Sequence, residues 1–136
     1  MIYLDSSVLL ELYLNRSHAA HAQELIDALE SKISSFLLLV EVPIALRRAL
    51  SRREDEATLA RGLDRFDEDL KRIGLLDSLT DVAIRVRSDR RFSRCRALDA
   101  VHACSALLMR EWTGHAVRLE TFDGRLEQLA VELGLR

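Results

Sequence analysis

The stretch IYLDSS, residues 2–7, begins as a buried strand and ends on a charge. Its apolar residues come first, and Asp5 then precedes Ser6 and Ser7. In an open parallel sheet, the carboxyl ends of the strands and the helix N-termini that follow them line the ligand crevice. Because an unpaired carboxylate is very costly in a core, we interpret Asp5 as held for a ligand. A second interpretation, in which Asp5 caps a helix that begins near Ser6, stays open.

Short β-like runs alternate with longer segments of helical periodicity along the rest of the chain. Strands are predicted over residues 1–4, 32–35, 72–75 and 116–121. Helices are predicted over residues 8–14, 19–30, 37–53, 54–70, 80–88, 98–112 and 125–133. Gly114 and Gly134 stand where helix C-termini often place a left-handed residue. Parallel neighbours need a long crossover, so this alternation predicts a mainly parallel sheet flanked by helices, a three-layer α/β sandwich.

Length and composition fit one compact domain. The chain has 136 residues, of which 49% are hydrophobic, and it contains no repeat or linker-like segment, so residues 1–136 are predicted to form a single domain. A formal net charge of -2 argues against a broadly basic nucleic-acid coat but leaves room for a local basic groove. The longest purely apolar run, residues 36–40, is far too short to span a bilayer, and Cys95 and Cys104 match no zinc or redox motif. We therefore expect a cytoplasmic protein without a membrane partner.

Three further acids share with Asp5 the oddity of apolar neighbours. Glu41 interrupts the apolar segment SFLLLVEVPIAL, and Asp99 lies in RALDAVHACSALL, whose apolar residues cover nearly the whole helix and predict burial. Asp123 follows the last predicted strand as Asp5 follows the first, with a cap for the helix of DGRLEQLAVEL as its alternative role. We predict that two strand ends and two helices bring the four carboxylates to one crevice.

Such a cluster needs a positive charge. Two bare carboxylates about 4 Å apart repel by roughly 4 kcal/mol at an effective dielectric constant near 20. Protons or cations would relieve this repulsion, and a set of hard oxygen ligands favours Mg²⁺ or Mn²⁺ over zinc. The sequence does not decide between one and two ions.

Four motifs in order, IYLDSS, SSFLLLVEV, RALDAVHACSALL and TFDGRL, give the chain a resemblance to PIN-domain ribonucleases, and in particular to the VapC-like toxins of toxin-antitoxin pairs. The resemblance runs the whole length of the chain. It implies that Asp5, Glu41, Asp99 and Asp123 form the catalytic metal site for Mg²⁺ or Mn²⁺, with Ser6 and Thr121 as polar support. It also implies an RNA substrate, a cognate antitoxin protein as partner and a homodimer.

Two residues complicate this picture. Pro43 lies two residues after Glu41 and removes an amide that would bond to the Leu39 carbonyl, so a kink is expected and the exact position of Glu41 is left open. His102 follows Asp99 by three residues and lies on a neighbouring helix face. Because apolar residues surround it, we interpret His102 as a buried residue with a packing or supporting role rather than as a ligand or a base.

Arginines cluster just before the helix that carries Asp99. The segment RVRSDRRFSRCR contains Arg90, Arg91, Arg94 and Arg96, which are candidates for RNA contacts because the planar guanidinium binds phosphate well. A solvated charged face is the alternative, since charge runs are weak evidence of function. If the toxin interpretation holds, the antitoxin is expected on leucine-rich faces of the early segments ELYL and ELIDALE.

We therefore predict a metal-dependent endoribonuclease, with a non-catalytic RNA- or protein-binding module on the same fold as the alternative. Two other acidic α/β classes fit less well. A phosphatase of the haloacid-dehalogenase type has a second Asp two positions after the first, where this chain has Ser7. A response-regulator receiver needs adjacent early acids and a late lysine, whereas the only lysines are Lys32 and Lys71.

Overall fold

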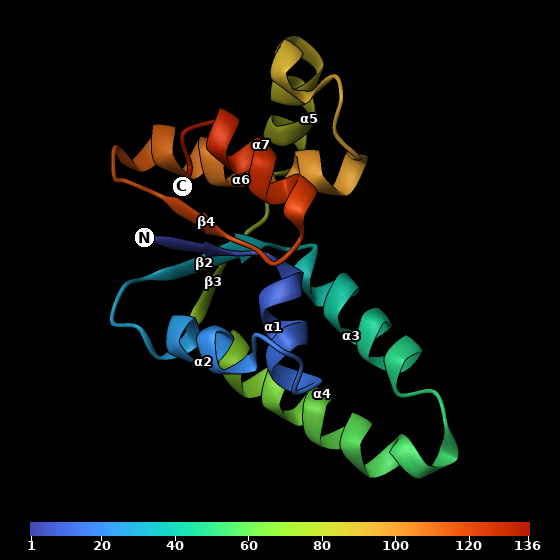
Figure 1. The fold of residues 1–136 in the computed structure, drawn as a ribbon. Coiled ribbons are helices and arrows are strands. Elements are labelled where there is room, and N and C mark those ends of the chain that lie inside the picture. Colours follow the sequence, from blue (N-terminus) through green and yellow to red (C-terminus); the bar gives the residue numbers. More distant parts are fainter.

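The computed structural model describes residues 1–136 and contains one four-stranded parallel sheet (Figure 1). The strands are β1 (Ile2–Leu4), β2 (Lys32–Ser35), β3 (Ile73–Leu76) and β4 (Arg118–Glu120), in the spatial order β3-β2-β1-β4. All three neighbouring pairs are parallel, and Ile2 of β1 lies opposite Lys32 on one side and Arg118 on the other. The predicted parallel α/β sandwich is confirmed.

Seven helices cover the two faces of the sheet (Figure 1). On one face lie α1 (Ser6–Tyr13), α2 (Ala19–Asp27), α3 (Leu38–Ala49) and α4 (Glu56–Leu70), and on the other lie α5 (Leu79–Ser88), α6 (Ala97–Thr113) and α7 (Gly124–Glu132). Two short 3₁₀ turns, Arg53–Asp55 and Arg90–Phe92, precede α4 and α6. No helix is long and apolar enough to cross a membrane.

The sheet separates two hydrophobic cores, because successive side chains of a strand point to opposite faces. Ile2 and Leu4 pack with α1 to α4, whereas Tyr3 between them packs with α6 and α7. All three side chains are almost fully buried, as expected for a strand with helices on both sides. The opening apolar residues of the chain therefore hold the two layers together.

Several predicted boundaries differ from the structure by a few residues. The helix predicted over 19–30 ends at Asp27, because Ala28 is extended and the Lys32 ammonium donates to the carbonyls of Ala28 and Glu30. The helix predicted over 37–53 ends at Ala49, and the strand predicted over 116–121 is reduced to Arg118–Glu120. Gly114 and Gly134 have φ values of 67° and 66°, which confirms their left-handed conformation.

The parallel topology gathers helix N-termini at one edge of the sheet. Strands β1, β2 and β4 are followed directly by α1, α3 and α7, so these helices begin where their strands end. Helix α3 continues through Pro43 without a break, and Ser35, the last residue of β2, accepts a hydrogen bond from the Leu37 amide at its start. Asp5, Glu41 and Asp123 therefore lie at the carboxyl edge of the sheet, where ligands bind in open parallel sheets.

Candidate functional site

Asp5 occupies the turn between β1 and α1 and caps the helix. Its Oδ2 atom accepts hydrogen bonds from the Ser7 amide at 3.2 Å, the Ser7 hydroxyl at 2.6 Å and the Thr121 hydroxyl at 2.9 Å. The other oxygen, Oδ1, makes two longer contacts, at 3.5 Å with the Ser6 hydroxyl and at 3.4 Å with the Nε2 of His102. Capping and a role at the site are thus compatible, because the carboxylate uses one oxygen for the cap and presents the other to the pocket.

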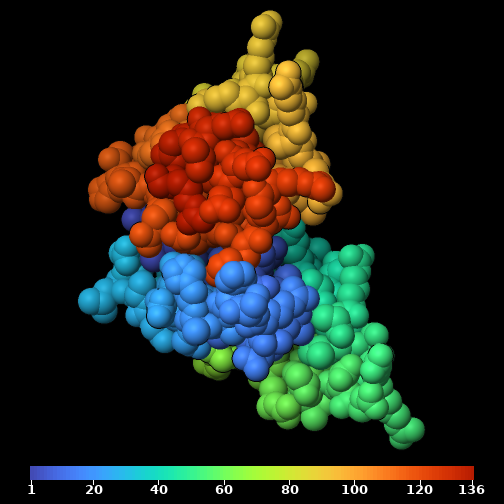
Figure 2. All heavy atoms as spheres, in the orientation of Figure 1, coloured from blue at the N-terminus to red at the C-terminus, as the bar shows by residue number.

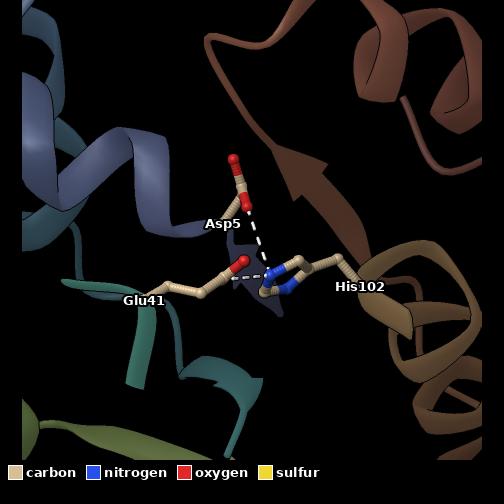
Figure 3. Close-up of side chains that lie close together, drawn as sticks. All are labelled: Asp5, Glu41 and His102. Carbon is tan, nitrogen blue, oxygen red and sulfur yellow. Dashed lines mark hydrogen bonds and ion pairs between the residues drawn. The ribbon is translucent and has the colours of Figure 1, made fainter. Parts of the chain in front are cut away.

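Glu41 and His102 meet Asp5 from two other helices (Figure 3). Glu41 lies in the first turn of α3, and its Oε2 is 2.7 Å from the Nε2 of His102 on α6. The same nitrogen is 3.4 Å from the Oδ1 of Asp5. Despite Pro43, Glu41 therefore reaches the strand-end acid, and a histidine lies between the two carboxylates.

The hydrogen bonds around His102 assign the roles of its two nitrogens. The Tyr3 oxygen accepts from the Ser35 amide at 2.9 Å, and burial raises the pKa of Tyr3, so the phenol keeps its proton. That proton is available to the Nδ1 of His102, which is 3.0 Å away. In the neutral imidazole, Nδ1 then accepts and Nε2 donates to Glu41. Tyr3 thereby orients the ring toward the acids.

Opposing effects act on the charge of His102. Burial lowers its pKa, whereas the hydrogen bond to Glu41 and the charges of Asp5, Glu41 and Asp99 raise it, and the net shift is upward. The ring is only 2% exposed, so a neutral form would be expected without these acids. The predicted burial of His102 is confirmed, but its contacts go beyond packing, because its Nε2 contacts the carboxylates of both Glu41 and Asp5.

Asp99 and Asp123 face the same pocket from α6 and from the loop after β4. Burial raises the pKa of Asp99 most, and the negative charges of Asp123 and Asp5 raise it further. Asp123 caps α7, where its Oδ1 accepts from the Arg125 amide at 2.8 Å and the Leu126 amide at 3.4 Å. The four acids, His102 and Arg96 border a hollow of about 340 Å³. The structure thus places all four sequence-predicted acids around one pocket.

The donor set suits a hard divalent cation. Asp5, Glu41 and His102 each offer one ligand atom, and these three atoms lie within 4.8 Å of one another. Carboxylate oxygens are suitable ligands for Mg²⁺ and Mn²⁺, and Asp99 and Asp123 add further oxygens at the border of the same hollow. The carboxylates therefore fit a bound metal, and His102 contacts two of them through its Nε2.

Hydroxyl groups surround the Asp5 carboxylate. Ser7 and the buried Thr121 both donate to Oδ2, and Ser6, the other residue expected to give polar support, borders the pocket with a long contact to Oδ1. The Ser7 hydroxyl also accepts from the Phe122 amide at 2.9 Å, which ties the start of α1 to the loop after β4. The residue two positions after an N-cap Asp commonly donates a hydrogen bond to the Asp side chain. This spacing from Asp5 could have indicated Ser7 from the sequence.

Three of the four candidate RNA-binding arginines line a second hollow beside the acid pocket. Arg91, Arg94 and Arg96 border it, whereas Arg90 is exposed outside it. Arg125 of α7 lines the opposite wall and was not singled out by the sequence, because an isolated arginine on an amphipathic helix carries no local signal. Arg91 is held by the Asp89 carboxylate at 2.6 Å, and this pairing lowers the pKa of Asp89 to about 2.

The fold and the site place the chain in the class of parallel α/β proteins that carry a carboxylate pocket at the carboxyl edge of the sheet. Within that class, residues 2–132 match the PIN domain family, and the chain belongs to this family. PIN domains are generally metal-dependent nucleases. No curated protein matches the chain.

Proposed function

We propose that the chain is an endoribonuclease that depends on Mg²⁺ or Mn²⁺ and cleaves RNA phosphodiester bonds at the pocket of Asp5, Glu41, Asp99 and Asp123. The observation that carries the proposal is the meeting of four carboxylates from four separate elements around one hollow. Family membership supports nuclease chemistry. Such a cluster is unfavourable without a cation, so its presence argues for metal binding.

Each residue of the pocket has a distinct task in this proposal. A bound divalent ion, or a pair of ions, lowers the pKa of water and neutralises charge on the phosphodiester. Asp5 would hold it through Oδ1, because Oδ2 is already occupied by Ser7 and Thr121. Asp99 is the second principal ligand, and Glu41 and Asp123 complete the site directly or through water. His102 orients Glu41 through the hydrogen bond at Nε2.

The direct test is cleavage of total RNA by the purified protein in Mg²⁺, Mn²⁺ or EDTA, followed by mapping of the RNA ends. We expect cleavage with either metal and none in EDTA. Asp99→Asn should abolish cleavage, whereas Asp67→Asn, a matched change at an exposed position on α4, should not. Cleavage that persists in EDTA or in the Asp99→Asn protein would overturn the proposal.

A non-catalytic binding module is the second candidate, and one observation favours it. The Nε2 of His102 already contacts the carboxylates of Asp5 and Glu41, and no buried polar side-chain atom in the structure lacks a hydrogen-bond partner. The cluster can therefore be satisfied without metal. Expression in cells separates the two functions, because a binding module would keep its cellular effect in Asp99→Asn and a nuclease would lose it.

We further propose that the protein is a VapC-like toxin, a homodimer that acts in the cytoplasm and is inhibited by an antitoxin. In the segments where the antitoxin is expected, Leu12, Leu25 and Ile26 are buried in the core, whereas Leu29 is fully exposed. Apolar side chains are also exposed along a groove of about 660 Å³ between α1 and α3, where Val40, Ile44 and Leu98 lie.

This apolar groove shares Glu41 and Leu98 with the acid pocket, so a protein bound in it would also cover the site. The test is co-purification with the product of a neighbouring short gene. Ile44→Glu should prevent co-purification, so the antitoxin should no longer inhibit RNA cleavage by this variant. Leu29→Glu, at a fully exposed leucine outside the groove, should still co-purify with the antitoxin and still be inhibited by it. Equal binding by both variants would refute this docking site, and light scattering of the purified protein tests the homodimer.

A further inference from the structure

A basic groove continues the acid pocket on its α7 side. It is a hollow of about 400 Å³ between α7 and the segment that joins the second 3₁₀ turn to α6, and it shares Arg96 and Asp99 with the pocket. Figure 2 shows this face, with α7 in red beside the amber segment that precedes α6. Arg94 lies on one wall and Arg125 on the other. A ligand in the pocket can therefore extend into the groove without leaving the protein surface.

The arginines of this groove are free to bind an anion. Arg94, Arg96 and Arg125 are exposed, and none of them makes an ion pair or a side-chain hydrogen bond in the structure. Other arginines of the chain are paired, as Arg91 is with Asp89 and Arg136 is with Glu120. Asp99 and Glu132 also line the hollow, but the four arginines on its walls outnumber them. Three guanidinium groups without an ion pair around one hollow suit a phosphate, which the planar fork of arginine binds well.

The two sides of the acid pocket are chemically different, and this difference indicates the path of a bound strand. On the α3 side the pocket opens into the apolar groove of Val40 and Ile44, and on the α7 side it opens into the basic groove. Arg16 and Arg48 also line the apolar groove, but Arg16 is paired with Glu11, whereas three arginines without an ion pair gather on the α7 side. A polyanionic strand therefore gains more electrostatic attraction on the α7 side. The backbone of a bound strand should therefore leave the pocket past Arg96 and run between Arg94 and Arg125.

We propose that the basic groove binds the RNA phosphate next to the scissile phosphodiester, with Arg94 and Arg125 as the contacts and Arg96 at the junction with the pocket. The identity of the polyanion rests on the proposed ribonuclease function. The placement of the anion rests on the unpaired arginines alone. Arg125 extends the earlier set of candidate RNA contacts, because it lies on α7, on the wall of the groove opposite the arginines that precede α6.

The test is binding of a fluorescein-labelled, single-stranded RNA of twelve nucleotides in EDTA, followed by fluorescence anisotropy at several salt concentrations. Each lost phosphate contact should lower the slope of log K against log salt by about 0.7, which corresponds to about 5-fold weaker binding at 0.1 M salt. We expect this for Arg94→Gln and for Arg125→Gln, and about 25-fold for the double variant. Gln keeps the backbone amide of residue 125, so the Asp123 cap of α7 is preserved.

Arg53→Gln is the matched control, since Arg53 is exposed, makes no ion pair and lies in the turn between α3 and α4, far from α7 (Figure 1). It should bind RNA as the unchanged protein does. Equal binding by all variants, equal weakening by Arg53→Gln or no RNA binding at all would overturn the inference. Weakening confined to the groove variants in a protein that cleaves no RNA would support the groove and refute the nuclease. If the protein cleaves RNA but the groove variants bind RNA as tightly as the unchanged protein does, the nuclease is supported and the groove is refuted.

Discussion

Replacement of Ser7 by alanine should destabilise the metal-free protein much more than the same change at Ser6. The Ser7 hydroxyl donates to the Asp5 carboxylate at 2.6 Å and accepts from the Phe122 amide at 2.9 Å. The Ser6 hydroxyl has one contact, at 3.5 Å, which is too long for a strong hydrogen bond. Both serines lie in the first turn of α1, so the change in helix propensity is the same for the two variants.

The contacts of Ser7 set the size of the effect. A hydrogen bond to a charged group contributes about 1.5–3 kcal/mol, and an amide left without a partner costs about 1–3 kcal/mol. Alanine returns roughly 0.5 kcal/mol through its higher helix propensity. Asp5 keeps its bonds to the Ser7 amide and to Thr121, so its charge does not become unpaired. We therefore expect Ser7→Ala to lower the free energy of unfolding by about 3 kcal/mol.

Equilibrium unfolding in urea with EDTA measures this difference. Ser6→Ala should change the free energy of unfolding by less than about 0.5 kcal/mol, as is usual for a substitution that removes no buried bond. For a chain of this length, about 3 kcal/mol corresponds to a fall in Tm of roughly 10 °C. If the two variants unfold at the same urea concentration, the assignment of Ser7 as the residue that fixes Asp5 is wrong.

Three further predictions test the site and the fold. Asp99→Asn should not lower the Tm in EDTA, because the Asp99 carboxylate is desolvated and repelled by other acids. Mn²⁺ should raise the Tm of the unchanged protein and of Asp67→Asn, and this rise should be absent in Asp99→Asn. The raised pKa of His102 stabilises the metal-free protein fully below the unfolded value of 6.5, and this stabilisation is lost as the pH rises through the higher folded pKa. Unfolding in EDTA should thus show a fall in stability above pH 6.5, and the fall should be absent in His102→Gln. Gly114→Ala should cost about 1 kcal/mol of folding free energy, because the residue has a φ of 67°, whereas Gly124→Ala should cost nothing measurable by urea titration.

The sequence was informative wherever a structural rule acts locally. The strand Lys32–Ser35 has the same bounds as predicted and as observed, although Ile33 is its only apolar residue. Its place between two segments of helical periodicity marked it as a strand. Asp5 and Asp123 follow two parallel strands, so their meeting at one sheet edge could be predicted without coordinates. The helix predicted over 19–30 failed at its end, because Lys32 binds carbonyls of the preceding turn and no local pattern announces this contact.

Relations between distant segments could not be read from the chain. His102 contacts Glu41, which is 61 residues away, and its apolar neighbours in sequence suggested only packing. Adjacent serines look equivalent in sequence, and the backbone turn at Asp5 decides that Ser7 points inward. Arg125 gains its position from the packing of α7 beside α6, which joins it to arginines about 30 residues earlier in the chain.

The electrostatics of the acid pocket explain why an RNA anchor should lie outside it. Asp5 and Asp123 cap α1 and α7, and Glu41 and Asp99 lie in the first turns of α3 and α6, so each acid gains about 0.3–1 kcal/mol from a helix N-terminus. Two carboxylate oxygens within 4.8 Å repel by about 3.5 kcal/mol at an effective dielectric constant near 20, which exceeds that gain. His102 offsets part of the difference, and a divalent cation would offset the rest. Until a cation is bound, the pocket repels a phosphodiester, so the attraction that first holds the strand must come from arginines beside the acids rather than among them.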